Sequence, residues 1–142
     1  WGRIGDCYFE LGTKDPAKLN DATNAYINVI NAPVAHRSAK DEARFKLAAT
    51  IEKQAALKTG ETQTALIKEA WRQYVTVFNQ AQTDPEGASP LWVKKSGQEA
   101  GRLAESLQDW GAALRIYGDL KKLLPGMAPI FDKKIAKISE HH

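Results

Sequence analysis

Few side chains in this sequence have the types and the spacing that catalysis needs. Cys7 and His36 could act as nucleophile and base, but no third residue is placed to orient the histidine and no motif surrounds either one. The chain has no glycine-rich phosphate loop, no metal-binding motif and no nucleophile elbow. The terminal pair His141–His142 is typical of a purification-tag remnant rather than of a metal site. We therefore expect no catalysis, no cofactor and no metal, and keep an enzyme or an enzyme-appended domain as a rival interpretation.

The composition indicates a folded protein. Of the 142 residues, 43% are hydrophobic and 26% are charged, which is ordinary for a domain with its own core. No apolar run reaches the 18 residues that a membrane span requires. The net charge of +3 is spread over both halves of the chain, so binding to nucleic acid is not favoured. Cys7 is the only cysteine, which excludes an internal disulfide, and we expect it to be buried in a helix.

Helical periodicity continues along the whole chain and is interrupted by turn residues. Asp15 and Ser89 each precede a proline, which is the pattern of an N-cap followed by proline at the first helical position. Residues 83–89 form the clearest loop, and a tight turn is expected at Gln108–Trp110. The predicted helices cover residues 1–12, 16–32, 34–57, 61–80, 90–107, 110–124 and 128–138.

The last predicted helix has the pattern of a capping helix. One face is apolar and the other is rich in lysine, so the helix can cover a core and still meet water. Together with Lys121 and Lys122, these lysines form a cluster that we expect to be solvated, with an acidic partner or an anionic lipid as the alternative. The apolar face has Met127, Ile130, Phe131, Ile135 and Ile138, and the lysines are Lys133, Lys134 and Lys137.

Two stretches share the spacing of small and aromatic residues that is typical of paired helices. Trp1, Ile4, Gly5 and Tyr8 follow the pattern W-x2-L-G-x2-Y, with isoleucine in place of leucine. Residues at this spacing lie on one helix face, and the glycine allows a second helix to approach closely. The second stretch has the matching positions Gly101, Ala113, Tyr117 and Pro125. On these residues the chain resembles the tetratricopeptide repeat family.

Three predicted second helices also contain an alanine four residues before a tyrosine. The alanines are 48 and 43 residues apart rather than the 34 of the family, which leaves a HEAT-like or armadillo-like scaffold as an alternative. The pairs are Ala22 with Tyr26, Ala70 with Tyr74 and Ala113 with Tyr117, and we expect the three tyrosines to be buried where the helices pack together.

The resemblance implies an all-α fold, an α-solenoid of about three antiparallel helix pairs followed by a capping helix. The repeats would cover about 1–33, 34–82 and 89–126, with the cap at 127–140, in a single domain 1–142. Because the chain starts inside an expected helix, we expect it to be the C-terminal part of a longer protein. The long helices are similar to those of bacterial cell-envelope assembly factors, which implies the periplasm or cell envelope, with the cytoplasm as the alternative.

The resemblance also implies a function, a scaffold that binds a peptide or helix of another protein in a concave groove. Self-association as a structural module is the main alternative. A clamp for a terminal carboxylate, formed by Lys46, Lys95 and Arg102, is disfavoured because the matching helices lack its asparagines. Phe9 and Phe45 lie off the packing stripe and are either exposed anchors or buried against a neighbour. The alternative for these positions is that they are solvated residues of a helix surface with no partner. The implied groove residues are Asp6, Phe9, Glu10, Phe45, Ala49, Glu52, Lys53, Gln98, Arg102, Glu105 and Ser106.

Overall fold

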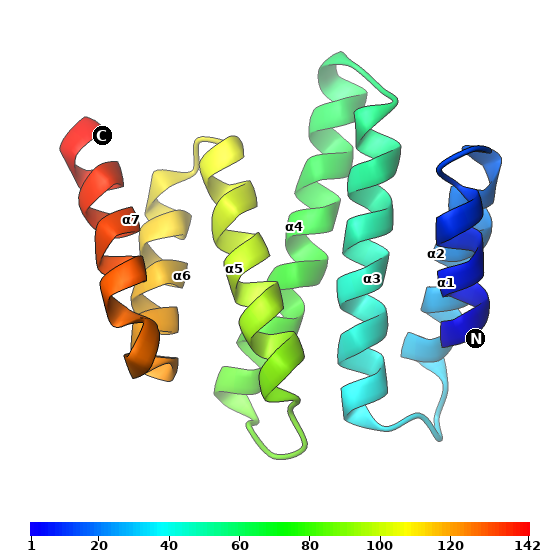
Figure 1. Ribbon diagram of the computed structural model, residues 1–142, viewed down its shortest axis with the longest axis horizontal. Helices are drawn as coiled ribbons and strands as arrows, with labels where there is room; N and C mark the ends of the chain where they lie inside the picture. Colours follow the sequence, from blue (N-terminus) through cyan, green and yellow to red (C-terminus); the bar gives the residue numbers. More distant parts are fainter.

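The computed structural model describes residues 1–142 and contains helices only, so the prediction of an all-α protein is confirmed (Figure 1). No helix combines the length and the apolar character that crossing a membrane would require. The elements are α1 (Gly2–Leu11), α2 (Ala17–Asn31), α3 (Arg37–Ala56), α4 (Gly60–Thr83), α5 (Pro90–Ser106), α6 (Trp110–Leu123), the 3-10 turn η1 (Pro125–Met127) and α7 (Ala128–His141).

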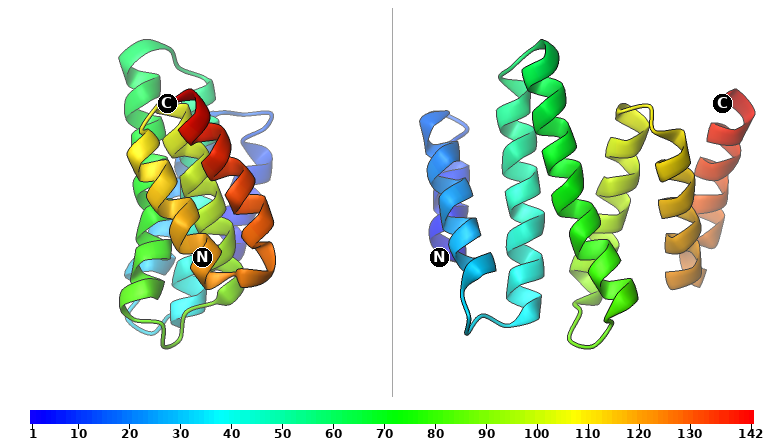
Figure 2. Two further views of the ribbon diagram at one scale, coloured as in Figure 1. Left: turned by 90° about the vertical axis from the view of Figure 1, so that its left-hand side faces the viewer. Right: turned by 180° about the vertical axis from the view of Figure 1, so that it is seen from behind.

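The helices lie in two layers. Each helix packs against the next one in the chain, and α3 also contacts both α1 and α5. The even-numbered helices make no contact with one another. The opposite views in Figures 1 and 2 show α1, α3 and α5 on one side and α2, α4 and α6 on the other. Helices α1, α3 and α5 therefore lie closer together on their side of the protein than α2, α4 and α6 do on theirs.

Local residues explain several of the helix ends. Gly12 caps α1, and its N–H donates to the Tyr8 carbonyl at 2.8 Å. Helix α5 begins at Pro90 with Ser89 as its N-cap, as the sequence predicts. Asp109 begins α6, where its Oδ1 accepts from the Ala112 N–H at 3.1 Å.

The core is organised around three tyrosines. Tyr26, Tyr74 and Tyr117 are each only 1% exposed, which confirms the prediction that they are buried between helices. A Cβ atom at Gly5 would lie 2.6 Å from the Tyr26 ring, and one at Gly101 would lie 2.5 Å from the Tyr117 ring. Glycine is required at both positions because any side chain would push the tyrosine, and with it the partner helix, away.

Several expectations are wrong at the surface. Cys7 is exposed rather than buried, since α1 packs only against α2 and α3 and Cys7 lies on the remaining face. Ile130 is 50% exposed, because the face of α7 that packs against α6 and η1 is the one that carries the buried residues Phe131 and Ile138. Val34 is 91% exposed and precedes α3, which begins three residues later than predicted.

We predict that Gly101→Leu destabilises the protein by about 1–3 kcal/mol, because the side chain must displace the Tyr117 ring. Gly118 is the matched control, since it lies within α6 and has nothing within 4 Å of a built Cβ atom. Urea unfolding of Gly118→Leu should show unchanged or slightly raised stability, by up to about 1 kcal/mol from helix propensity. Equal midpoints for Gly101→Leu and the wild-type protein would contradict the packing described above.

Candidate functional site

Five of the predicted groove residues, Ala49 among them, line one hollow between α1 and α3. Asp6, Phe9 and Glu10 of α1 meet Phe45 of α3 at a hollow of about 420 Å³. Tyr26, Lys46 and Ala49 complete its lining. We call this space the α1–α3 hollow, and we call the exposed side of α1, α3 and α5 the odd-helix face.

The two phenylalanines form the apolar part of the hollow. Both rings are half-buried and pack against the core. The Phe45 ring centroid is 5.3 Å from that of Tyr74 and 5.3 Å from that of Trp92. The Lys53 Nζ lies 4.0 Å from the centroid of the Phe9 ring, which is within the range of a cation–π contact. Phe9 and Phe45 therefore form an apolar wall of the hollow, with one side packed on the core and the other facing the hollow. Neither ring projects freely from the surface as an anchor.

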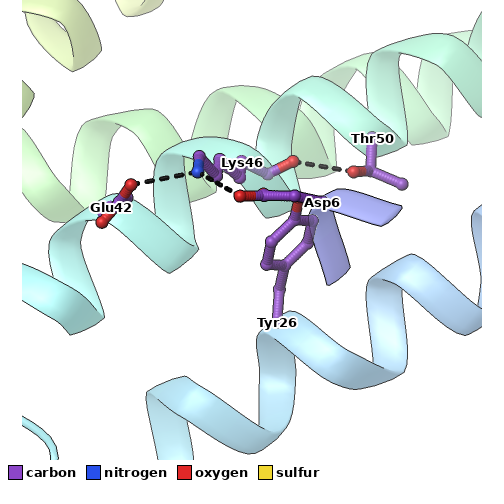
Figure 3. Close-up of polar contacts among 5 residues, drawn as sticks. All are labelled: Asp6, Tyr26, Glu42, Lys46 and Thr50. Carbon is purple, nitrogen blue, oxygen red and sulfur yellow. Dashed lines mark hydrogen bonds and ion pairs between the residues drawn. The ribbon is translucent and has the colours of Figure 1, made fainter. Parts of the chain in front are cut away.

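Asp6 joins three helices at the edge of the hollow (Figure 3). The Tyr26 hydroxyl of α2 donates to Asp6 Oδ1 at 2.6 Å, and Lys46 Nζ of α3 donates to Asp6 Oδ2 at 2.9 Å. The same Lys46 Nζ lies 3.0 Å from Glu42 Oε1, one turn earlier in α3. One lysine is thus shared by two carboxylates, and one carboxylate is bound by both a phenol and an ammonium group.

Glu52 forms a second network of the same design between α3, α4 and α5. The Tyr74 hydroxyl donates to Glu52 Oε2 at 2.6 Å, and Arg102 Nη2 donates to Glu52 Oε1 at 2.7 Å. Arg102 also pairs with Glu99, to which its Nε donates at 2.6 Å. As in the first network, a cation from the next odd-numbered helix lies between two carboxylates.

The third tyrosine repeats only half of this arrangement. The Tyr117 hydroxyl donates to Glu105 Oε2 at 2.5 Å. No cation pairs with Glu105, although Lys134 Nζ of α7 lies 5.5 Å from the centre of the Tyr117 ring. Gln98 is half-buried in α5, and its side chain makes no hydrogen bond within the protein.

These contacts shift the titration of the groups involved. Burial raises the pKa of Tyr26, Tyr74 and Tyr117 well above its usual value, and the hydrogen bond from each hydroxyl to a carboxylate raises the pKa further. Burial alone would lower the pKa of Lys46 and Arg102, but their hydrogen bonds to carboxylates outweigh this effect and raise both. The phenols therefore stay protonated and the two cations stay charged at every physiological pH.

The cationic candidates for a carboxylate clamp are all occupied within the protein. Lys46 and Arg102 are held by the two networks, and Lys95 Nζ lies 5.1 Å from the centre of the Trp92 ring.

Cys7 and His36 are both exposed and share no hydrogen bond. The ring of His142 stacks on Trp110 at 3.8 Å. No group of three His, Cys, Asp or Glu side chains is close enough to hold a metal ion.

Sequence reasoning missed three residues of the odd-helix face. Glu42 and Glu99 complete the two networks, and Trp92 packs on Phe45. The spacing of Glu42 from Lys46 and of Glu99 from Arg102 is that of an ion pair on a helix surface, which was a usable signal. The contact between Trp92 and Phe45 joins positions 47 residues apart and has no local signal.

The raised tyrosine pKa values predict a loss of stability at alkaline pH. An unfolded tyrosine ionises near pH 10, whereas the folded ones stay protonated, so the stability that they contribute is intact below about pH 10 and falls above it. Each tyrosine should add about 1.4 kcal/mol per pH unit to this fall. The free energy of unfolding, measured with urea between pH 8 and 11.5, should fall less steeply with pH in Tyr117→Phe than in the wild-type protein, by about this amount per pH unit. Parallel curves for the two proteins would refute the assigned burial and hydrogen bond.

No protein-family model, curated protein or solved structure matches the chain. An assignment of function therefore has to rest on the geometry of the candidate site.

Proposed function

We propose that the chain is an α-solenoid scaffold of the tetratricopeptide kind, whose odd-helix face binds a peptide or helix of another protein. The observation that carries the proposal is the α1–α3 hollow, where an apolar wall of two phenylalanines opens next to fixed carboxylates. Sites for partner segments typically combine an apolar anchor pocket with a few polar groups held in place.

The arrangement of the helices supports a concave face. Helix α3 contacts both α1 and α5, whereas α2, α4 and α6 make no contact with one another, so the row of helix pairs bends toward the odd-helix face. Helix pairs that each pack mainly on their neighbours are typical of solenoids. A HEAT-like scaffold has the same general geometry, and it would use the same face.

The two carboxylate networks support a preorganised surface. Each one joins consecutive helix pairs through side chains that are partly buried and hydrogen-bonded at both ends. A surface whose polar groups are already held in position loses less conformational entropy when a partner binds.

We predict that Ala49→Trp abolishes capture of the partner, because the indole fills the α1–α3 hollow without removing a packed side chain. The matched control is Ala136→Trp, at an exposed position of α7. Each tagged variant should be cross-linked in cells that contain the protein, and the captured proteins should be compared after circular dichroism has confirmed folding. Partners retained by wild type and Ala136→Trp should be lost with Ala49→Trp. Equal capture by all three proteins would exclude the hollow as the binding site.

Self-association is a second candidate, favoured by the apolar outer side of α1. Trp1, Ile4 and Leu11 lie at helical spacing and are 63%, 44% and 52% exposed. A second copy that packed on this stripe would remove these side chains from water.

Light scattering separates the two candidates. If α1 mediates self-association, the molar mass should rise to that of a dimer with concentration, without any added ligand, and Ile4→Glu should remain monomeric. Ala49→Trp should leave this mass unchanged, since the α1–α3 hollow is separate from the outer stripe. A monomer at all concentrations would exclude the self-association candidate.

A further inference from the structure

We propose that the turn between α6 and α7 binds the surface of an anionic lipid bilayer and inserts its apolar residues among the lipid headgroups. We call residues 121–134 the α6–α7 tip, since they end α6, form η1 and begin α7 (Figure 1). The tip lies at the C-terminal end of the row of helices, whereas the α1–α3 hollow lies near its other end. The inference is therefore independent of the proposed function.

The tip has an uncharged centre between two pairs of lysines. Lys121 and Lys122 precede nine residues without a charge, and Lys133 and Lys134 follow these residues after Asp132. Segments that bind at the surface of a bilayer combine apolar side chains, which enter the boundary of the acyl region, with lysines that reach the headgroups. The order of residues along the tip provides both parts.

Large apolar side chains of this centre are in contact with water. Leu123 is 48% exposed and Ile130 is 50% exposed. Pro125 and Gly126, between them in the turn, are also exposed. Phe131 is 0% exposed and belongs to the core, so it fixes the base of the tip. The tip therefore holds an apolar surface in place, and burial of this surface in the headgroup layer would favour binding.

Most lysines of the tip have no carboxylate partner. Lys121 Nζ lies 2.6 Å from Asp132 Oδ1, and no carboxylate pairs with Lys122, Lys133 or Lys134. With four lysines and one aspartate, the tip has a net charge of +3. Each lysine held close to an anionic bilayer adds to the attraction, which falls off within a Debye length.

The residues next to the tip in the sequence leave this excess in place. Asp119, which precedes the tip in α6, is offset by Lys137, which follows it in α7. Residues 110–142 contain six lysines and arginines against three carboxylates, whereas residues 1–109 contain fourteen of each. The last two helices are therefore basic, and the rest of the chain is balanced.

The segments beside the tip in space do not reverse the charge either. Helices α5 and α6 are antiparallel neighbours, so the start of α5 lies beside the end of α6 (Figure 1). Lys94 and Lys95 lie in the first two turns of α5, which contain no carboxylate. In the loop before α5, Asp84 Oδ2 lies 3.3 Å from Arg37 Nη1, which leaves Glu86 as its unpaired carboxylate. This end of the α5–α6 pair is therefore positive as well.

A bilayer fits the tip better than an acidic protein does. The tip is the end of a helix hairpin at the outer edge of the row of helices (Figures 1 and 2). A convex end of this kind can enter a layer of headgroups, whereas the side chain of a protein partner needs a pocket. Three of the four lysines have no partner within the protein, so they can adjust to mobile headgroups.

The test measures binding of the full chain to lipid vesicles by co-sedimentation. The chain should bind phosphatidylcholine vesicles that contain about 30 mol% phosphatidylserine, but not phosphatidylcholine alone, and about 0.5 M sodium chloride should release it. Binding to the mixed vesicles should fall by about tenfold or more in Lys122→Glu/Lys133→Glu. The matched control Lys14→Glu/Lys58→Glu has the same net charge and changes exposed positions elsewhere, so it should bind like wild type. Circular dichroism should confirm that both double variants are folded.

The apolar part of the tip is tested separately. Ile130→Ser should weaken binding several-fold, whereas Val34→Ser, at a position that is 91% exposed, should not. An environment-sensitive NBD fluorophore can be attached to Gly126→Cys in a Cys7→Ala background, because nothing lies within 4 Å of a Cβ atom at Gly126. Its emission should brighten and shift to shorter wavelength on the mixed vesicles. The same label on Lys58→Cys should show no such change.

Several results would overturn the inference. Failure to bind the mixed vesicles would leave the lysines to an acidic protein or to solvent. Equal binding to both kinds of vesicle would exclude recognition of anionic lipid, and equal weakening by the two double variants would show that net charge alone attracts the chain. Binding without a change in the emission of the Gly126→Cys label would exclude insertion of the tip. None of these results bears on the binding of a partner in the α1–α3 hollow.

Discussion

The structure depends on a buried tyrosine that crosses from one helix layer to the other. In each of the pairs α1–α2, α3–α4 and α5–α6 the ring comes from the even-numbered helix and the hydroxyl reaches a carboxylate on the odd-numbered one. Gly5 and Gly101 are small enough for the ring to fit between the layers. The contact therefore sets the distance between the two helices of a pair and places a carboxylate at the edge of the odd-helix face.

The same carboxylates connect one helix pair to the next. Asp6 binds Lys46, and Glu52 binds Arg102, so each tyrosine bond continues into an ion pair with the following odd-numbered helix. Core packing and the chemistry of the surface are consequently coupled. The third carboxylate, Glu105, is bound by its tyrosine and by no cation, so this coupling stops at α5.

The candidate site illustrates why charged residues on a helix face need a tertiary structure before they can be interpreted. As isolated positions, Asp6, Glu52 and Arg102 are equally consistent with solvated residues and with a groove. In the structure they are ion-paired, and the apolar wall of the α1–α3 hollow is the part of this face that stays open.

The sequence alone determined the helical class and most helix ends, because these follow from local spacing, caps and prolines. It also determined the burial of Tyr26, Tyr74 and Tyr117, which follows from the spacing. Only the tertiary structure decided that Cys7 and Ile130 are exposed and that Phe45 contacts Trp92. They depend on which helix covers which face and on contacts between residues far apart in the chain, and the periodicity within one helix contains no information about either.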